Sequence, residues 1–295
     1  MAAGDADSVP RPGLLEAVGR VRAAGLLATE PEAEMPPDVD QLTASIAGEP
    51  WSAIRPVLAA VGFAEVGADP AGGRLFAAYD PDRDRWLRLS LAPNRPPGDS
   101  SRRSRMRPLA GLIVAVLGPD GSGKSTLTET LAEAFVLPVR LLYAGLYPAD
   151  RRRFRQPGIG TAALLLRLWR LAIASSWERS RGRLVLFDRY AYDARLPLPP
   201  HAGRRTRLRR AILARALPTP DLVIVLDAPV DVLLGRRQEH SADVIAAQRR
   251  RYAELAREAP DGVIVDASEA AAAVRRKVTA LIWARFVERR GGRGV

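Results

Sequence analysis

Residues 112–125 read LIVAVLGPDGSGKS, a run of six apolar residues that leads into a glycine-rich loop and a lysine. An apolar run of this length is typical of a strand buried on both faces. The loop, which starts at Gly118, fits the pattern G-x-x-x-x-G-K-S/T, and residues 125–135 after it have the pattern of a helix. A strand, this loop and a helix in this order predict a binding site for the phosphates of a nucleoside triphosphate.

Each part of the loop has a physical role toward phosphate. Glycines let the backbone N–H groups turn inward around an anion, and the following helix presents free N–H groups and the positive end of its dipole. Lys124 is expected to reach the β- and γ-phosphates of ATP, and the Ser125 hydroxyl to bind Mg²⁺. Lysine occurs at only one other position, 277, in this arginine-rich chain. The residues expected to bind the nucleotide are Gly118, Pro119, Asp120, Gly121, Ser122, Gly123, Lys124, Ser125 and Thr126.

Further apolar runs after the loop define the fold class. They are short and β-branched, they alternate with helical patterns, and they lie at 139–143, 183–187, 222–226 and 263–265. Near-continuous apolar strands separated by helices indicate a parallel sheet covered on both faces. The sequence therefore predicts a doubly wound α/β domain.

A change of composition divides the chain. The stretch 92–108 (APNRPPGDSSRRSRMRP) is rich in proline, serine and arginine and is typical of a linker. We expect a small α+β domain over 1–95, a linker over 96–107 and the P-loop domain over 108–290. In the first domain a helix is predicted at 51–61 and strands at 75–79 and 86–91, whereas the first 35 or so residues carry weak signals.

Composition and charge limit the class of protein. The 295 residues contain no cysteine, which excludes disulfides and thiolate metal sites. The net charge is +12, and the basic excess lies entirely after residue 95, which favours an anionic partner. The most apolar segment, 161–177, is too short and too charged to span a bilayer, so we expect a buried helix there and a cytoplasmic protein. Nucleic acid is not expected as a partner, and a homodimer is left open.

Two further segments carry charged residues where ligands of such sheets bind. The strand at 183–187 is followed by Asp188 and Arg189, at the edge where strand ends meet ligands. Asp188 is expected to hold Mg²⁺ or to activate the acceptor, and Arg189 to clamp the transferring phosphoryl group. Arg236 and Arg237, after the strand at 222–226, are candidates for neutralising charge in the transition state.

Taken together, these pieces resemble the thymidylate kinase family. They are GPDGSGKST at 118–126, DRY at 188–190, PDLVIVLDAP at 220–229 and VIVDAS at 263–268, in the family's order within about 110–285. The resemblance implies a five-stranded parallel sheet of P-loop kinase type and an arginine-bearing lid near 236–252. It also implies that Asp120 faces the sugar of the phosphate acceptor and that Arg189 contacts phosphate.

The resemblance is greatest to divergent relatives with a DRYxYD segment, here DRYAYD at 188–193. The family's base-reading stretch with Ser, Tyr and Gln is replaced by ARLPLPPH at 194–201 and a basic helix from Arg204. The resemblance thus implies ATP-dependent phosphoryl transfer, with Mg²⁺, to a small anionic acceptor such as a nucleoside monophosphate. The altered segment predicts that thymidine monophosphate is a poor acceptor.

The first domain contains a weaker signal. Asp38 and Asp40 resemble the D-x-D pair of nucleotidyltransferases, but the Gly-Ser turn is missing and Ser90 stands where a third carboxylate is expected. We expect a nucleotidyltransferase-like fold without catalysis. For the whole chain, two alternatives to a kinase stay open: a P-loop ATPase or nucleotide switch without a small acceptor, and a basic protein that binds a polyanion.

Overall fold

The computed structural model describes residues 13–28, 40–46, 48, 51–68, 73–94, 110–145, 159–196, 203–237 and 241–291. Contacts divide the chain into two compact units, one built on Ala110–Val278 and the other on Asp5–Leu109 with Thr279–Val295. The predicted domain limits stay a prediction, and the grouping by contacts differs from them at the C-terminus. Within the described ranges, no helix combines the length and apolar character needed to cross a bilayer.

The unit with the phosphate loop contains a five-stranded sheet in the order β6-β7-β5-β8-β9, with every neighbouring pair parallel. Its strands are β5 (Leu112–Leu117), β6 (Val139–Tyr143), β7 (Leu184–Asp188), β8 (Leu222–Asp227) and β9 (Gly262–Asp266). The central strands β5, β7 and β8 are buried almost throughout, as their continuous apolar runs predict. The predicted doubly wound α/β fold with a five-stranded parallel sheet is therefore confirmed.

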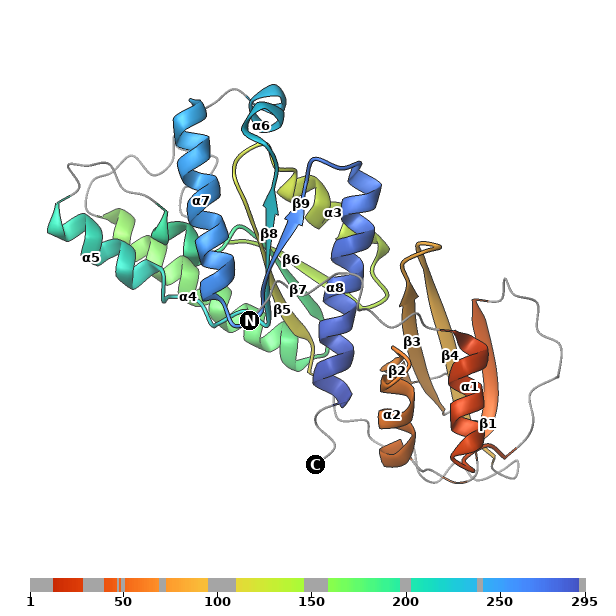
Figure 1. Cartoon of the computed structure of the whole chain (residues 1–295). Helices are drawn as coiled ribbons and strands as arrows, with labels where there is room; N and C mark the ends of the chain where they lie inside the picture. The colour runs from red at the N-terminus through yellow and green to blue at the C-terminus, as the bar shows by residue number, and fades with distance from the viewer. Residues whose placement is uncertain are drawn as a thin grey trace. The chain divides into compact units, whose positions relative to one another are not determined.

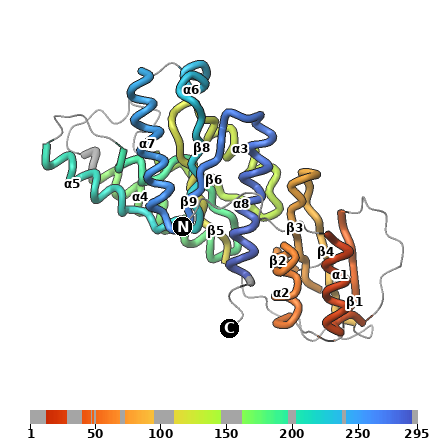
Figure 2. Tube along the Cα trace, in the orientation of Figure 1, coloured from red at the N-terminus to blue at the C-terminus, as the bar shows by residue number. Residues whose placement is uncertain are grey.

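Helices cover both faces of this sheet. They are α3 (Lys124–Ala134), α4 (Ile159–Ser180), α5 (Arg204–Leu213), α6 (Val230–Arg236), α7 (Ala242–Glu258) and α8 (Ala271–Gly291), with a short 3₁₀ helix η2 (Ala191–Arg195). Figure 1 shows α4 and α7 on one face and α3 with the start of α8 on the other, and the tube in Figure 2 follows the same path. The core beneath α4 and α7 joins Ile113, Val185 and Val223 of the strands to Leu168 and Leu255 of the helices.

Helix α4 corrects one expectation. The segment 161–177 is helical, as predicted, but it is not a buried helix. Only one face of the helix packs on the core, so four large apolar side chains are 47–61% exposed: Leu166, Trp169, Ile173 and Trp177. The spacing of three to four residues places these four on a common face.

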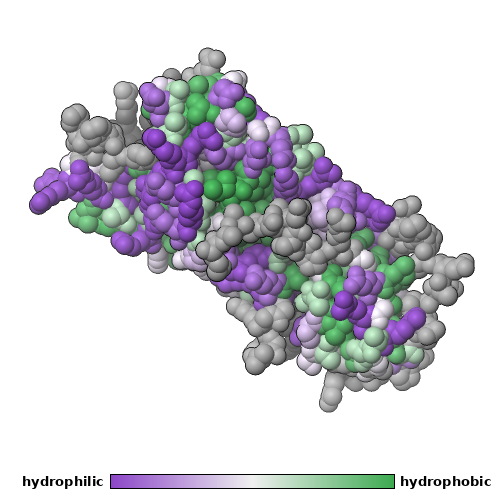
Figure 3. Space-filling model, in the orientation of Figure 1, coloured by the Kyte–Doolittle hydropathy of each residue, from purple (hydrophilic) through white to green (hydrophobic). Residues whose placement is uncertain are grey.

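The basic helix predicted from Arg204 is α5. Arg204, Arg205, Arg207 and Arg209 are exposed, whereas Arg210 donates to the Leu196 carbonyl at 2.8 Å. On the face shown in Figure 3, hydrophilic atoms cover the region of α5 and α7. Positions 197–202, which precede this helix and include most of the altered acceptor segment, lie outside the described residues.

The other unit has a mixed sheet in the order β1-β4-β3-β2, in which β1 runs parallel to β4 and the remaining pairs are antiparallel. Its elements are α1 (Leu14–Ala23), β1 (Gln41–Ile46), α2 (Trp51–Ala59), β2 (Ala64–Ala68), β3 (Arg74–Asp80) and β4 (Arg85–Pro93). Its core joins α1 and α2 to one face of the sheet, with Ile46, Ile54 and Leu89 fully buried. The predicted helix at 51–61 and strands at 75–79 and 86–91 are all present.

The later part of α8 belongs to this unit. Trp283 donates its indole N–H to the Gly62 carbonyl at 2.9 Å and stacks edge-on against Trp86 with 5.0 Å between ring centroids. Phe286 packs on the same indole at 5.2 Å. Residues 279–291 therefore complete the aromatic side of the small unit instead of extending the phosphate-loop unit.

The residues of the weak nucleotidyltransferase signal do not assemble a carboxylate site among the described positions. Asp40 is exposed and pairs with Arg85 at 2.7 Å, and Ser90 is buried in β4 opposite Thr43 of β1. Asp38 lies outside the described residues. The nucleotidyltransferase likeness of this unit stays a hypothesis.

Candidate active site

The glycines of the phosphate loop have the backbone conformations that the motif requires. The loop connects β5 to α3, and Gly118, Gly121 and Gly123 have φ angles of 145°, 85° and 85°. A Cβ atom on Gly118 would lie 2.3 Å from the Leu226 carbonyl oxygen. Only glycine fits this position, because both the backbone conformation and the close approach of β8 exclude a side chain.

The ammonium group of Lys124 lies inside the loop. Its Nζ donates to the Pro119 carbonyl at 2.6 Å and lies 4.0 Å from a carboxylate oxygen of Asp120. The pKa of Lys124 is lowered from 10.5 to about 8, chiefly by burial and secondly by the nearby Arg189 guanidinium, while the surrounding carboxylates oppose the change. An anion bound in the loop would compensate this buried charge.

Ser125 and Asp188 meet at the carboxyl end of the sheet, as the sequence predicts. The Ser125 hydroxyl donates to Asp188 Oδ2 at 2.7 Å, and Asp188 pairs in register with Val116 of β5. Asp188 Oδ1 is buried and has no hydrogen-bond partner among the described residues. Mg²⁺ prefers oxygen ligands, and it binds few protein side chains when phosphate oxygens supply the remaining ligands. A hydroxyl and a buried carboxylate oxygen without a partner are therefore suitable ligands for Mg²⁺.

Arg189 lies beside the loop and pairs with Asp120. The residue is one of two non-glycine positions with a positive φ in the described chain, at 65°, and its backbone N–H donates to the Val116 carbonyl at 3.1 Å. A terminal nitrogen of its guanidinium is hydrogen-bonded to Asp120. Burial lowers the pKa of Arg189, but the carboxylates of Asp120 and Asp193 outweigh it and hold the pKa above its ordinary value. Arg189 therefore stays cationic beside the phosphate loop.

Arg236 and Arg237 lie beside the loop, where α6 ends. Arg236 is the last residue of α6 and donates to the Ala267 carbonyl at 2.8 Å. Arg237 follows it directly, and its Cβ lies 3.5 Å from the place that a Cβ on Gly121 would take. The predicted role of both arginines in neutralising charge stays a prediction.

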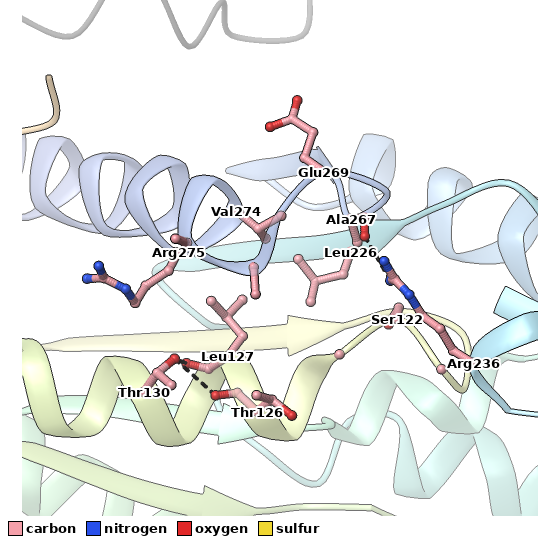
Figure 4. A pocket seen from close by; sticks show the side chains of 14 residues that line it. Ser122, Thr126, Leu127, Thr130, Leu226, Arg236, Ala267, Glu269, Val274 and Arg275 are labelled. Atoms are coloured by element: carbon pink, nitrogen blue, oxygen red, sulfur yellow. Dashed lines mark hydrogen bonds between the residues drawn. The ribbon is translucent and has the colours of Figure 1, made fainter. Parts of the chain in front are cut away.

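A cavity of about 500 Å³ opens beside the loop. Figure 4 shows Leu127 and Thr130 of α3 below it and Val274 and Arg275 of α8 above it, with Arg236 reaching across to Ala267. Gly121, Ser122, Gly123 and Thr126 of the loop also line it. Its lining is mostly apolar with a few charged side chains, as is common for pockets that bind small molecules.

Sequence reasoning missed most of this cavity. The residues concerned lie on the inner face of α3, at the end of β8 and at the start of α8, and no motif marks them except VIVDAS at 263–268. The run of four alanines at 270–273 is a further signal for this cavity, because small residues let the start of α8 lie close to the loop. Sequence reasoning also assigned no role to Asp193 and Tyr252, which contact the Arg189 group.

Comparison with known proteins identifies relatives of this chain. No protein-family model matches it. It is 31% identical over 218 residues to a thymidylate kinase of Pseudomonas fluorescens and 30% identical over 217 residues to one of Pseudomonas putida, in each case over 59% of this chain and 96% of the relative. A thymidylate kinase of Pseudomonas entomophila is 28% identical over 219 residues, again over 59% of this chain and 96% of that enzyme.

Two solved structures are similar to parts of the chain. One is a thymidylate kinase from Candida albicans, at 18% identity and a TM-score of 0.45 over 62% of this chain and 93% of that one. The other is a deoxyadenosine kinase from M. mycoides, at 12% identity and a TM-score of 0.43 over 56% and 95%. The sequence relatives are matched over nearly their whole length at up to 31% identity, so the chain belongs to the thymidylate kinase family.

Proposed function

We propose that the chain is an ATP-dependent nucleotide kinase that transfers the γ-phosphoryl group of ATP to a small anionic acceptor, a nucleoside monophosphate or a related metabolite. The observation that supports this most strongly is the meeting of three groups at one loop: the Lys124 ammonium, the Ser125–Asp188 pair and the Arg189–Asp120 pair. Phosphoryl transfer needs mainly positioning and charge stabilisation, and these groups supply both. The names of the sequence relatives agree with this class of reaction.

In this proposal ATP, the phosphoryl donor, lies along α3. The loop N–H groups and Lys124 hold the β- and γ-phosphates, and the cavity between α3 and α8 takes the base. Arg236 and Arg275 flank this cavity, where a guanidinium plane can stack on an aromatic base. One consequence is that nucleotide binding depends on residues far from the motif, in the segment 267–275.

The oxygen atoms of Ser125 and Asp188 would hold Mg²⁺, and the ion would neutralise and orient the phosphates when bound. Arg189, which stays cationic and is 27% exposed, would receive the charge of the transferring phosphoryl group. Asp120, within the loop, orients Arg189 through its hydrogen bond and would also accept from a hydroxyl of the acceptor.

The acceptor differs from thymidine monophosphate in this proposal. The stretch 194–201 lacks the amide side chains that would fix a base edge, and a site without those hydrogen bonds loses orientation as well as affinity. The exposed arginines of α5 suit a more anionic or a larger acceptor. They also favour a second candidate, a basic protein that binds a polyanion, here through α5, and a salt-dependent titration would detect such binding.

A homodimer stays a prediction, and the exposed apolar face of α4 is where we would look for its interface.

Calorimetry with MgATP tests the nucleotide site. Wild type and Lys277→Ala are expected to bind alike, because Lys277 is exposed and pairs with Glu269 at 2.5 Å. Lys124→Ala is expected to lose binding by about a hundredfold or more, since a charge-assisted contact to phosphate is removed. ATP affinity in Lys124→Ala equal to that of the wild type would contradict the proposal.

A further inference from the structure

Arg189 is held at two points, and only one of them belongs to the phosphate loop. One terminal nitrogen of the guanidinium bonds to Asp120, and the other lies 3.7 Å from Asp193 Oδ2. Asp193 is in η2, four residues after Arg189. The guanidinium is thus gripped by two carboxylates from different segments, which fixes its plane more narrowly than one ion pair would.

Asp193 is a carboxylate in a buried position, which is unusual for an acidic residue. Its side chain is only 7% exposed, and burial raises its pKa while Arg189 and the Tyr252 hydroxyl oppose the rise. The Tyr252 hydroxyl donates to Asp193 Oδ1 at 2.9 Å. A buried ion pair of this kind adds little net stability compared with apolar residues, so its contribution to the fold does not explain it well. Holding a neighbouring charged group in place explains it better.

Tyr252 brings a distant helix into this network. It is 1% exposed and lies on α7, the helix that follows Arg236 and Arg237 in the chain. The same helix is fastened to the end of β8, where Arg249 donates to both carboxylate oxygens of Asp227 at 2.7 and 2.9 Å. Helix α7 is therefore bonded to the ends of two site-bearing segments, one of them through the partner of Arg189.

We propose that Asp193 and Tyr252 are positioning residues. Tyr252 orients Asp193, and Asp193 holds the Arg189 guanidinium toward the transferring phosphoryl group. The chain of contacts from α7 to Asp120 thereby sets the geometry of the site. This inference rests on the proposed function. Neither residue touches the reacting atoms in this scheme, so both act entirely through Arg189.

A double-mutant cycle on the intact chain tests the proposal. The probe is ADP with Mg²⁺, titrated with and without aluminium fluoride, which stands in for the transferring phosphoryl group. The measured quantity is the ratio of ADP affinity with aluminium fluoride to ADP affinity without it. A merely structural role would weaken both titrations alike and leave this ratio unchanged.

Tyr252→Phe, Asp193→Asn and Arg189→Ala are each expected to lower this ratio, the last of them by about tenfold, because a charge-assisted contact is lost or misaligned. In the Arg189→Ala background, Asp193→Asn and Tyr252→Phe are expected to lower it no further, since residues that act through one another are not additive. Tyr192→Phe is the matched control. It removes a hydroxyl from the residue that precedes Asp193 in the chain, whose ring packs against the Arg195 guanidinium at 4.8 Å, and it should leave the ratio unchanged.

Additive losses in the double variants would overturn the proposal, as would a wild-type ratio in both Tyr252→Phe and Asp193→Asn. A wild type that binds ADP but gains nothing from aluminium fluoride would also overturn it while leaving nucleotide binding intact. A wild type that binds neither ADP nor ATP would instead overturn the proposed function, and this inference with it.

Discussion

Replacing Lys124 with methionine is expected to abolish nucleotide binding and, at the same time, to stabilise the fold. Lys124 is 6% exposed, and its ammonium group has the Pro119 carbonyl and the Ser122 hydroxyl as hydrogen-bond acceptors. Methionine keeps a similar volume and removes the buried charge. A residue retained for ligand binding at the expense of stability should show both effects in one substitution.

The size of the stabilisation follows from the pKa of Lys124. The decrease from 10.5 to about 8 corresponds to roughly 3 kcal/mol at pH 7. Methionine also leaves the Pro119 carbonyl without its donor, which costs about 1–2 kcal/mol. The net expectation is that Lys124→Met raises the free energy of unfolding by about 1–2 kcal/mol at pH 7.

The pH dependence gives a second signature. Between about pH 8 and 10.5 the unfolded chain keeps a proton on this lysine that the folded chain has lost, so the stability of the wild type rises with pH in this window. The advantage of Lys124→Met should shrink accordingly as the pH rises through it. Lys277→Met is the matched control and should change stability by less than about 1 kcal/mol at any pH in this window.

Urea unfolding followed by circular dichroism measures these differences. The transition that ATP shifts in the wild type belongs to the unit with the phosphate loop, and it is the one to compare. If Lys124→Met proved less stable than the wild type at pH 7, or if its advantage persisted at pH 10.5, the reasoning about the buried charge would be refuted.

Three further experiments with substituted chains test other parts of the site and of the chain. Ser125→Ala should reduce Mg²⁺-dependent ATP turnover by about a hundredfold or more because a metal ligand is lost, whereas Ser125→Thr should retain it; equal rates in both would remove Ser125 from the metal site. Ala272→Trp, which fills the cavity between α3 and α8 from an exposed position, should weaken ATP binding by about tenfold, and Ala273→Trp, outside the lining, should not. Asp38→Asn combined with Asp40→Asn should change no activity, and metal-dependent nucleotidyl transfer that disappears in this variant would show that the small unit is an enzyme.

The sheet of the phosphate-loop unit was predictable because its strands are continuous apolar runs, and Leu112–Leu117 and Val139–Tyr143 were predicted with their observed limits. Helix α1 was missed, although Leu14, Ala17, Val18 and Val21 are buried at helical spacing. Three of these four are small or β-branched residues, and their signal is weak against an alanine-rich background.

Long-range contacts explain the other differences between expectation and structure. No local pattern announces that α8 leaves one unit and completes the other through Trp283, because its partner Gly62 is more than two hundred positions away. The exposed face of α4 was hidden for a related reason. A helix with apolar residues on all sides is expected to be buried, and the sequence does not indicate which side lacks a covering element.

Two hydrogen bonds of the candidate site differ in how far the sequence predicted them. Ser125 and Asp188 were expected together, because strand order brings the ends of β5 and β7 to one edge. The hydrogen bond between Arg236 and the Ala267 carbonyl was not expected, since it depends on the direction of a flexible side chain at the end of α6. Motifs therefore located the groups of the loop and Asp188, while the residues that line the cavity and those behind Arg189 required the three-dimensional structure.

The most direct measurement of phosphoryl transfer follows label from ATP carrying a radioactive γ-phosphate into a panel of nucleoside monophosphates, nucleosides and sugar phosphates, with Asp188→Asn as the inactive control. We expect labelled product with at least one anionic acceptor, and with thymidine monophosphate a turnover below the range of about 1–100 per second that is usual for kinases. Release of labelled phosphate to water alone, whatever acceptor is present, would contradict a kinase and favour an ATPase. Turnover of thymidine monophosphate within the usual range would contradict the account of the acceptor segment 194–201.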